Sequence, residues 1–405
     1  MPMIKTKQIT LLLVSISLLV SIAAFVFIKF MPSAAEENLE SKSYENTPAI
    51  TADENSLGDY YVPEITILPK PETFTMLNAG DFLTKISQYQ TMKKDPSGLY
   101  QIDDLIAGHK GFVEDADLAL CHLEILEGPD GPKLDNSGKA PVFSSPPNLI
   151  SELKKNGWDG CSAASNHSLD GGMRNIEQTI SSAEKNNFGI SGIATKPDNS
   201  IAYYTLKSDN TDLTIANISF TWSTNLIPKP AGKEFSVNTF SRFDKNITAI
   251  TAQAEEARAN GADIVALSIH CCQEYITTPD ADQIKIAQLI ADSGAIDIYI
   301  GHHPHVPQPI VKLESNNQVG YMWTAYSLGN HINSLPYDDT AIGILALSEI
   351  TKDPTSGKIE DITMSYTTVE TIYKDGTYKT VLGGTQNPIL HIMAGSDAKY
   401  FTIPN

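Results

Sequence analysis

The stretch of sequence that decides the fold runs from residue 263 to residue 305: DIVALSIHCCQEYITTPDADQIKIAQLIADSGAIDIYIGHHPH. It predicts a buried strand over Asp263–His270, an amphipathic helix over Asp282–Asp292 and a second strand over Ile296–Ile300. Apolar strands that alternate with helices are typical of an α/β domain. Both strands lead directly into histidines, where site residues of α/β domains usually collect.

The same arrangement recurs upstream of this stretch. Apolar runs end at Gly80-Asp81 and at Glu124, and a third leads into Asn166-His167. A helix is predicted to begin near residue 145, with Ser145 as its capping residue and a proline in its first turn. Further helices are predicted over 173–187 and 247–260, a strand over 213–220, and β-rich segments over 342–350 and 359–372.

The polar residues at the strand ends form a mixed set of oxygen and nitrogen donors. Each residue alone is weak evidence, because a single histidine or Gly-Asp pair after a strand is commonly structural. Together, one Asp, one Glu, one Asn and at least three His suit Zn, Mn or Fe better than Ca²⁺. A carboxylate between two such ligand sets could bridge two divalent metal ions, and we therefore expect a metal site.

The N-terminal sequence predicts a membrane anchor or a signal peptide. Residues 9–28 are twenty uncharged, mostly apolar residues, which is long enough for a helix that spans a bilayer. Lys5 and Lys7 precede them and favour a cytoplasmic N-terminus. A cleaved signal peptide is the alternative for residues 1–30, with small residues at 33–35 as the cleavage site. Either reading places the remainder of the chain outside the cytoplasm, with a single-pass anchor in the cell membrane as the preferred one.

A flexible acidic linker is predicted over residues 31–71. This segment holds eight acidic residues and two lysines, with several prolines and little apolar periodicity. The whole chain of 405 residues has 29 Lys+Arg and 48 Asp+Glu, a formal charge of −19. Such a balance argues against nucleic-acid binding through a broad basic face.

The four cysteines are too few and too irregularly spaced for a disulfide framework or a CxxC zinc site. A bridge between Cys121 and Cys161 could form, because they precede two site segments on strands expected to be neighbours. The adjacent Cys271 and Cys272 could form a disulfide, bind metal or stay reduced and buried. Sequence alone does not give the Cα spacing that decides between these states.

Six segments occur in an order that resembles one protein family. They are Gly80-Asp81, Leu123-Glu124, Ser165 to Asp170, His270 with Glu274-Tyr275, Gly301 to Val306, and Tyr326 to Asn330. The resemblance is to the CapA family, the capsule or poly-γ-glutamate synthesis proteins of the calcineurin-like metallophosphoesterase superfamily. It covers roughly residues 74–335 and implies a four-layer αββα sandwich with ions at the sheet ends. We expect this domain over residues 72–335, preceded by the N-terminal transmembrane helix. A β-rich segment over residues 336–405 is expected to complete the same domain.

The resemblance also implies ligand roles. Asp81 and His305 would hold the first ion and Glu124 would bridge the two. The residues expected to hold the second ion are Asn166, His270 and His303.

Two further residues would act on the substrate. His167 resembles the histidine that protonates a leaving group or steadies an oxyanion. Asp170 would orient His167, or else cap a helix that starts at Gly171.

The chain departs from the family pattern at two positions. Leu83 stands where the superfamily usually has histidine, and His122 stands where the family usually has asparagine. Residues two apart in a strand face the same side, so His122 and Glu124 should project together. Our hypothesis is that His122 supplies the nitrogen ligand that Leu83 cannot, and the alternative is that it only forms hydrogen bonds. We expect His302 to support a ligand and His109 to lie at the surface.

These expectations combine into a functional prediction. The leading interpretation is an exported, membrane-anchored, metal-dependent hydrolase that acts on an anionic cell-surface polymer such as capsule or poly-γ-glutamate. The alternative is a non-catalytic accessory subunit that binds polymer and holds the subunits of a membrane synthase complex together.

Overall fold

The computed structural model describes residues 69–138, 141–197, 200–333, 338–383, 392–393 and 395–401. These residues belong to one compact unit of the chain. The predicted membrane segment at residues 9–28 and most of the predicted linker at 31–71 lie outside the described residues. Among the helices that are described, none is both long and apolar enough to cross a bilayer.

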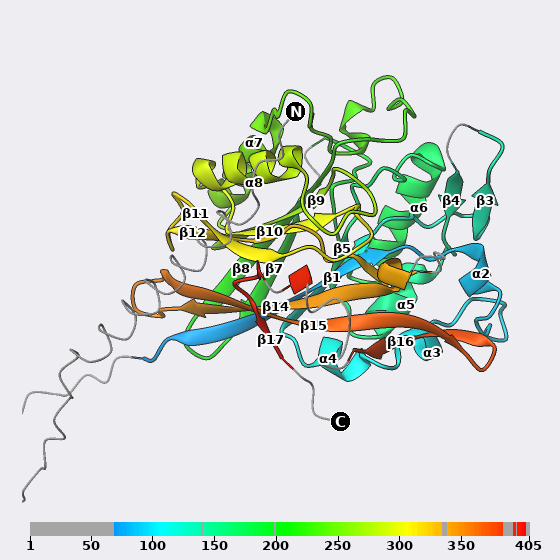
Figure 1. Cartoon of the computed structure of the whole chain (residues 1–405), viewed down its shortest axis with the longest axis horizontal. Helices are drawn as coiled ribbons and strands as arrows, with labels where there is room; N and C mark the ends of the chain where they lie inside the picture. The colour runs from blue at the N-terminus through cyan, green and yellow to red at the C-terminus, as the bar shows by residue number, and fades with distance from the viewer. Residues whose placement is uncertain are drawn as a thin grey trace, which may run out of the picture. The chain divides into compact units, whose positions relative to one another are not determined.

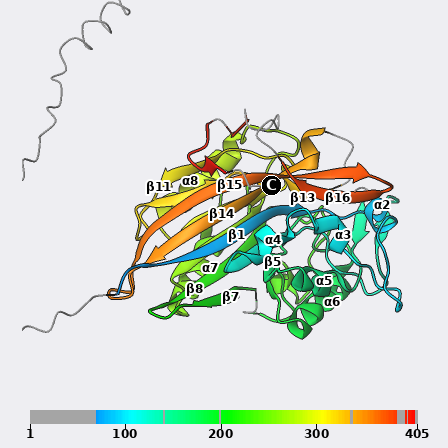
Figure 2. The same ribbon diagram turned by 90° about the horizontal axis from the view of Figure 1, so that it is seen from below.

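Two large sheets organise the described unit (Figure 1). The larger sheet has nine strands. Its main order is β16 (Thr377–Leu382), β15 (Ile359–Lys374), β14 (Ile342–Lys352), β1 (Glu72–Phe82), β2 (Leu118–Leu123), β5 (Gly160–Ser162) and β6 (Gly189–Ser191). Outside this order, β13 (Asn330–Ile332) pairs with β1 and β17 (Lys399–Tyr400) pairs with β15. Figure 2 shows β15, β14 and β1 lying side by side.

The second sheet has six strands. Their order is β11 (Ile310–Glu314), β12 (Tyr321–Ala325), β10 (Ile298–His302), β9 (Ile264–His270), β8 (Asp212–Thr221) and β7 (Ala202–Lys207). A small hairpin joins β3 (Lys133–Asp135) to β4 (Val142–Ser144).

Helices connect the strands. The α-helices are α2 (Ile86–Tyr89), α3 (Asp103–Ile106), α4 (Lys110–Glu114), α5 (Leu149–Lys155), α6 (Gly172–Lys185), α7 (Thr248–Ala259) and α8 (Ala281–Ser293). The 3₁₀ turns η1 (Glu234–Ser236) and η2 (Asp338–Ala341) also lie between strands.

Three large apolar clusters lie on the faces of the two sheets, because side chains alternate along each strand. Met76 of β1 and Ile264 of β9 belong to the core between the two sheets. The next residue of β1, Leu77, instead packs with α5 and α6 on the outer face of the larger sheet. Likewise Val265 packs with α7 and α8 on the outer face of the smaller sheet. The layers are therefore helices, sheet, sheet and helices, and the predicted α/β class is confirmed.

Parallel strands bring the site residues together. Strands β1, β2, β5 and β6 run parallel, as do β8, β9, β10 and β12. The carboxyl ends of parallel strands meet at one edge of their sheet, which is where polar site residues of such folds gather. This topology places the predicted strand-end residues in neighbouring positions.

One predicted helix cap is wrong. Helix α5 begins at Leu149 with Asn148 as its N-cap residue, so Ser145 lies before the helix. Two consecutive prolines follow Ser145, and a proline disfavours helical backbone in the residue before it. The Ser145 hydroxyl instead donates to the carbonyl of Ile125 at 3.1 Å.

Both cysteine pairs form disulfides in the structure. Cys121 and Cys161 lie opposite each other in the register of β2 and β5, and their sulfurs are bonded. Cys271 and Cys272, which follow β9, are bonded to each other. All four cysteines are buried, and none is free.

Candidate metal centre

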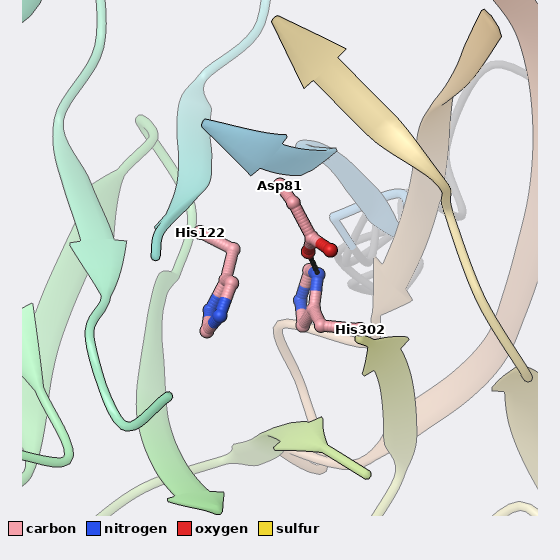
Figure 3. Close-up of side chains that lie close together, drawn as sticks. All are labelled: Asp81, His122 and His302. Atoms are coloured by element: carbon pink, nitrogen blue, oxygen red, sulfur yellow. Dashed lines mark hydrogen bonds and ion pairs between the residues drawn. The ribbon is translucent and has the colours of Figure 1, made fainter. Parts of the chain in front are cut away.

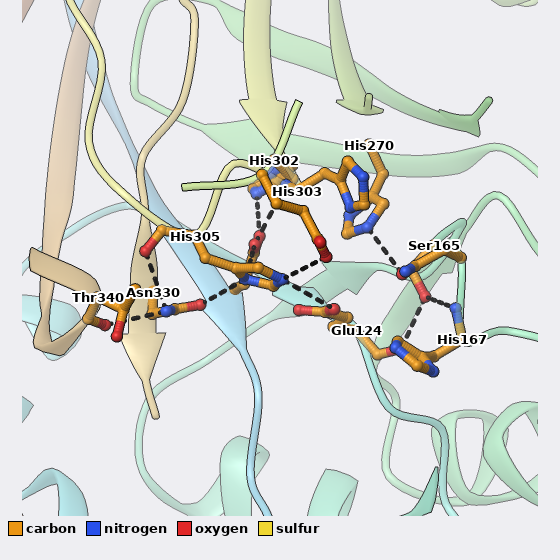
Figure 4. Close-up of polar contacts among 12 residues, drawn as sticks. Glu124, Ser165, His167, His270, His302, His303, His305, Asn330 and Thr340 are labelled. Atoms are coloured by element: carbon orange, nitrogen blue, oxygen red, sulfur yellow. Dashed lines mark hydrogen bonds and ion pairs between the residues drawn. The ribbon is translucent and has the colours of Figure 1, made fainter. Parts of the chain in front are cut away.

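The carboxyl ends of both sheets contribute to one buried cluster of carboxylates and imidazoles (Figure 4). Asp81 lies near the end of β1, and Glu124 follows β2 in the larger sheet. His270 ends β9 and His302 ends β10 in the smaller sheet. The predicted site residues therefore come together from both sheets, as their strand-end positions indicate.

Asp81 is the most heavily bonded carboxylate of this cluster. Its Oδ1 lies 2.8 Å from Nδ1 of His302, and its Oδ2 accepts a hydrogen bond from the backbone N–H of His303 at 3.2 Å. Nδ1 of His305 lies 3.4 Å from Oδ2. Burial acts to raise the pKa of Asp81, but hydrogen bonds from His302 and His305 lower the pKa well below its usual range. Asp81 is therefore a carboxylate, the form that binds a cation.

His122 lies beside Asp81 and His302 (Figure 3). Potential ligand atoms of these three residues lie within 4.8 Å of one another. The ring of His122 stacks on that of His302, with 4.0 Å between the centroids. Its two nitrogens also have protein partners, because Nδ1 lies 2.8 Å from the Ser162 hydroxyl and Nε2 lies 3.0 Å from Nδ1 of His270. The structure brings His122 to the site as predicted, and its ligand role stays a prediction.

Glu124 provides the clearest test of whether a cation fits. The residue is fully buried, and neither carboxylate oxygen has a hydrogen-bond partner among the described residues. Its Oε1 lies 3.7 Å from Nε2 of His305. Burial raises the pKa of Glu124 to about 7, and the charge of His305 opposes this rise. Buried carboxylates are rarely left without partners, so the donor set of Asp81, Glu124 and His305 fits a metal ion.

A second group of donors adjoins the first through His305. Glu274, His303 and His305 place potential ligand atoms within 4.8 Å of one another. Nδ1 of His303 is buried and has no hydrogen-bond partner among the described residues. Burial lowers the pKa of His303 to about 4, so this ring is neutral and keeps a lone pair for a metal.

His270 and Asn166 complete the predicted ligand set. Nε2 of His270 lies 2.9 Å from Oδ1 of Asn166, and the rings of His270 and His303 are 4.7 Å apart. Burial lowers the pKa of His270 well below its usual value, which also keeps this ring neutral. The three residues predicted for a second ion are therefore close neighbours.

Unusual backbone conformations turn the histidines after β10 toward the site. His303 and His305 have φ values of 93° and 60°. Such values are uncommon for residues other than glycine, and here they interrupt the alternation expected of a continuing strand. As a result His302, His303 and His305 all contact the carboxylate cluster. Asn330 fixes His305 further, because its Oδ1 lies 2.9 Å from Nδ1 of that ring.

His167 and Asp170 form a pair beside this cluster. Nδ1 of His167 lies 2.7 Å from Oδ2 of Asp170, and the same oxygen accepts the backbone N–H of Phe143 at 2.8 Å. Helix α6 begins at Gly172 with Gly171 as its N-cap and no side-chain capping hydrogen bond. Of the two roles predicted for Asp170, the structure supports orientation of His167 over capping.

A cavity of about 300 Å³ opens onto the cluster. Its walls combine ligand candidates with residues that could contact a substrate. The lining residues are Leu83, Lys85, Glu124, Pro141, Phe143, Asn166, His167, Asn225, Glu274, Tyr275 and His305.

Sequence reasoning missed some of the residues in this cluster. His302, expected to support a ligand, itself contacts Asp81. In the sequence Glu274 and Asn330 stand out only as members of longer segments, whereas the structure places both beside His305. The prediction for His109 is wrong: it is buried, with Nε2 2.9 Å from Nε2 of His331 and Nδ1 2.9 Å from the Thr380 hydroxyl. Thr380 is 271 residues away in the chain, so no local signal indicated this burial.

Comparison with known proteins gives one family match. The model of the family described as "Bacterial capsule synthesis protein PGA_cap" matches residues 75–335. The "PGA biosynthesis protein CapA" of Bacillus subtilis is 29% identical over 213 residues, which are 52% of this chain and 52% of that protein. The "Capsule biosynthesis protein CapA" of Bacillus anthracis is 26% identical over 192 residues, 47% of this chain and 44% of that protein. The matches thus span about half the length of these curated relatives.

Solved structures show weaker similarity. A phosphatase from Mycoplasma pneumoniae is 11% identical with a TM-score of 0.38, covering 73% of this chain and 94% of that one. The calcineurin-like phosphoesterase YfkN from Bacillus subtilis is 13% identical with a TM-score of 0.37, covering 78% and 90% of the two chains.

Proposed function

The chain belongs to the family of bacterial capsule synthesis proteins, and on this premise we propose that it acts on an anionic cell-envelope polymer, capsule or poly-γ-glutamate, as a hydrolase with two divalent metal ions. The proposal includes a single N-terminal membrane anchor at residues 1–30 and an extracytoplasmic domain. Zn, Mn and Fe are the ions that the donor set suits.

The observation that carries the catalytic part of the proposal is the environment of Glu124. The carboxylate is fully buried, its oxygens have no hydrogen-bond partner among the residues that the structure describes, and it groups with Asp81 and His305. Glu274 and His303 adjoin through His305. Metal binding requires neutral imidazoles and ionised carboxylates, and Asp81, His270 and His303 have pKa values shifted toward these forms. The pKa values of Glu124 and His305 are raised, so these two residues would release protons when an ion binds. The cluster therefore suits a pair of ions better than it suits a metal-free core.

The chain's own residues have separable tasks in this proposal. Asp81, Glu124, Asn166, His270, His303 and His305 would hold the ions, with His122 as a further candidate. Bound metal supplies a water of lowered pKa and polarises the bond that is attacked. Asp170 fixes the His167 ring through Nδ1, which leaves Nε2 to pass a proton to the leaving group. Phe143 packs edge-to-face on His167, with 4.9 Å between the ring centroids, and restricts its rotation further.

A second candidate function is a non-catalytic accessory subunit that binds polymer and holds a membrane synthase complex together. The names of the two curated relatives favour it, because both refer to biosynthesis rather than hydrolysis. The N-terminal segment suits both candidates.

One set of variants separates the two functions. Metal content is measured for the wild-type protein, Asp81→Asn and His167→Ala, followed by hydrolysis of bis(4-nitrophenyl) phosphate and of a γ-glutamyl amide. The hydrolase proposal expects bound metal in the wild type and turnover that both variants lose while remaining folded. A folded wild-type protein without metal contradicts it. Polymer production in cells that survives both substitutions but fails on deletion of residues 1–30 supports the accessory subunit instead.

A further inference from the structure

A lysine lies on the wall of the cavity that opens onto the metal centre. Lys85 lines this cavity of about 300 Å³ together with Glu124, His167 and Glu274. It follows Asp81 by four residues, just past the end of β1, and it is half-buried. A cation in this position is unexpected among a set of metal-binding residues, because it repels the ions that they would hold.

The ammonium group of Lys85 has no hydrogen-bond or ion-pair partner in the described part of the chain. None of the hydrogen bonds or ion pairs of the described residues includes its Nζ, although the backbone N–H of Lys85 donates to Gln88 Oε1 at 2.9 Å. Its side-chain contact is a loose one with the Phe143 ring, whose centroid lies 5.8 Å from Nζ. Burial lowers the pKa of the Lys85 ammonium, and the charges of Glu124 and Glu274 partly offset this.

Other partly buried lysines of the chain do have partners. Nζ of Lys352 donates to the carbonyl of Asp212 at 2.7 Å and lies 2.8 Å from Oδ2 of Asp263. Nζ of Lys229 donates to the carbonyl of Glu234 at 3.0 Å and to the Thr239 hydroxyl at 2.9 Å. Lys85 differs from both, because its Nζ has no hydrogen-bond acceptor among the described residues and stays accessible on the cavity wall. A ligand that brings an acceptor into the cavity would find this ammonium group available.

We infer that Lys85 binds a carboxylate of the substrate chain while the neighbouring bond lies over the metal centre, which makes Lys85 a specificity-determining residue. This inference rests on the proposed function, in which the substrate is an anionic polymer. In a γ-linked glutamate chain every residue keeps a free α-carboxylate next to the amide bond. The same cavity is lined by Lys85 and by the candidate metal ligands Glu124 and His305, which suits such a pairing of charged group and reacting bond.

The acidity of the chain strengthens the inference. At a formal charge of −19 the protein repels a polyanion at long range, so attraction must arise from local cations. When Glu124 and Glu274 are engaged by metal ions, they no longer counterbalance Lys85. Its charge then adds to that of the ions rather than being cancelled by the cavity's own acids.

The adjoining cavity offers a matched control. This space of about 280 Å³ shares Phe143 with the first cavity and includes Lys133 in its lining. Nζ of Lys133 lies 3.4 Å from Oδ2 of Asp135, so that lysine already has an acid partner. Lys133→Gln changes the net charge of the protein as much as Lys85→Gln does, at a nearby site.

The test measures binding rather than turnover. Full-length, metal-loaded protein in detergent is titrated calorimetrically with N-acetylated penta-γ-glutamate and with its uncharged full methyl ester. Wild type should bind the acid more tightly than the ester. Lys85→Gln should reduce this preference roughly tenfold, Lys85→Arg should retain most of it because guanidinium also binds carboxylates, and Lys133→Gln should leave it unchanged within about twofold.

The outcomes separate the two proposals. An unaltered preference for the acid in Lys85→Gln, with wild-type binding intact, overturns the inference about Lys85 alone. Binding that depends on Lys85 without any hydrolysis contradicts the catalytic proposal and supports Lys85 as a binding residue. A wild-type protein that does not bind the pentamer overturns both the polymer substrate and the role of Lys85.

Discussion

Oδ2 of Asp170 lies 2.7 Å from Nδ1 of His167 and holds one nitrogen of that ring in a hydrogen bond. The same oxygen accepts the backbone N–H of Phe143, so the carboxylate links the His167 ring to the segment that packs against it. His167 also lines the cavity beside Glu124. The orientation of this histidine thus depends on one carboxylate oxygen.

We predict that Asp170→Asn lowers kcat about 10- to 100-fold with little change in KM, because the ring loses its fixed orientation. Steady-state hydrolysis of bis(4-nitrophenyl) phosphate measures both constants. Asp130→Asn is the control, since Asp130 is an exposed partner of Arg174, and it should leave kcat within twofold. An Asp170→Asn protein with wild-type kcat would show that Asp170 does not position His167 for catalysis.

His122→Ala should lower metal affinity about tenfold or reduce the number of bound ions, because His122 lies within 4.8 Å of Asp81 and His302. Metal is counted by inductively coupled plasma mass spectrometry after dialysis against a range of free Zn²⁺ or Mn²⁺. His109→Ala is a matched control, because it truncates a buried histidine that bonds His331 outside the site. Unchanged stoichiometry and affinity in a folded His122→Ala protein excludes the ligand role.

Glu127→Gln should stabilise the protein at alkaline pH. Burial raises the pKa of Glu127 from an ordinary value of 4.5 to about 7, and a hydrogen bond from the backbone N–H of Ile150 opposes the rise. The folded state therefore binds this proton more tightly than the unfolded state does. The resulting stabilisation is complete below about pH 4.5 and is lost as the pH rises through about 7.

The variant keeps a neutral side chain at every pH, so its free energy of unfolding at pH 8 should exceed the wild-type value by about 2 kcal/mol. At pH 5 the free energies of unfolding of the variant and the wild type should differ only slightly. Urea unfolding at both pH values measures this, with Glu114→Gln as a control because Glu114 is an exposed partner of Lys110. Equal pH dependence for wild type and Glu127→Gln would contradict the assignment.

Replacing Cys121 and Cys161 together by alanine should lower the free energy of unfolding by about 2–4 kcal/mol, because their bridge closes a long loop in the unfolded chain. The sequence separation is 40 residues. The double alanine variant at Cys271 and Cys272 is the comparison, because adjacent residues close no such loop. Calorimetric or urea unfolding measures both, and thiol counting without reductant checks that wild type has no free cysteine. Equal losses in the two variants would exclude loop closure as the cause.

Periodicity and strand ends were sufficient to predict the α/β class and most of the clustered residues. Asp81, Glu124 and His270 follow short apolar runs, and parallel strands carry such positions to one edge of a sheet. The pattern failed where the backbone departs from regular geometry. His302 and His303 are adjacent, so strand alternation sends only one of them to the site, whereas the φ of 93° at His303 lets both reach it.

Long-range packing accounts for the other differences. His109 lies in a polar, glycine-flanked stretch, and only its contacts with His331 and Thr380 reveal that it is buried. In the sequence nothing distinguishes Lys85 from an ordinary surface lysine, and only the structure places it on the wall of the cavity. Ser145 is the exception, because its cause is local: it has the right side chain for a cap, but the two prolines after it move the start of the helix to Leu149.

The Cys121–Cys161 bridge has a consequence for damage to the chain. Glu124 and the β3–β4 hairpin lie within the loop that it closes. A protease that cuts the main chain once between residues 122 and 160 would leave two fragments still joined through sulfur. Strands β2 and β5 would stay paired, and the nicked protein would separate into two bands on a gel only after reduction. The geometry around Glu124 can thus outlast a break in the polypeptide that carries it.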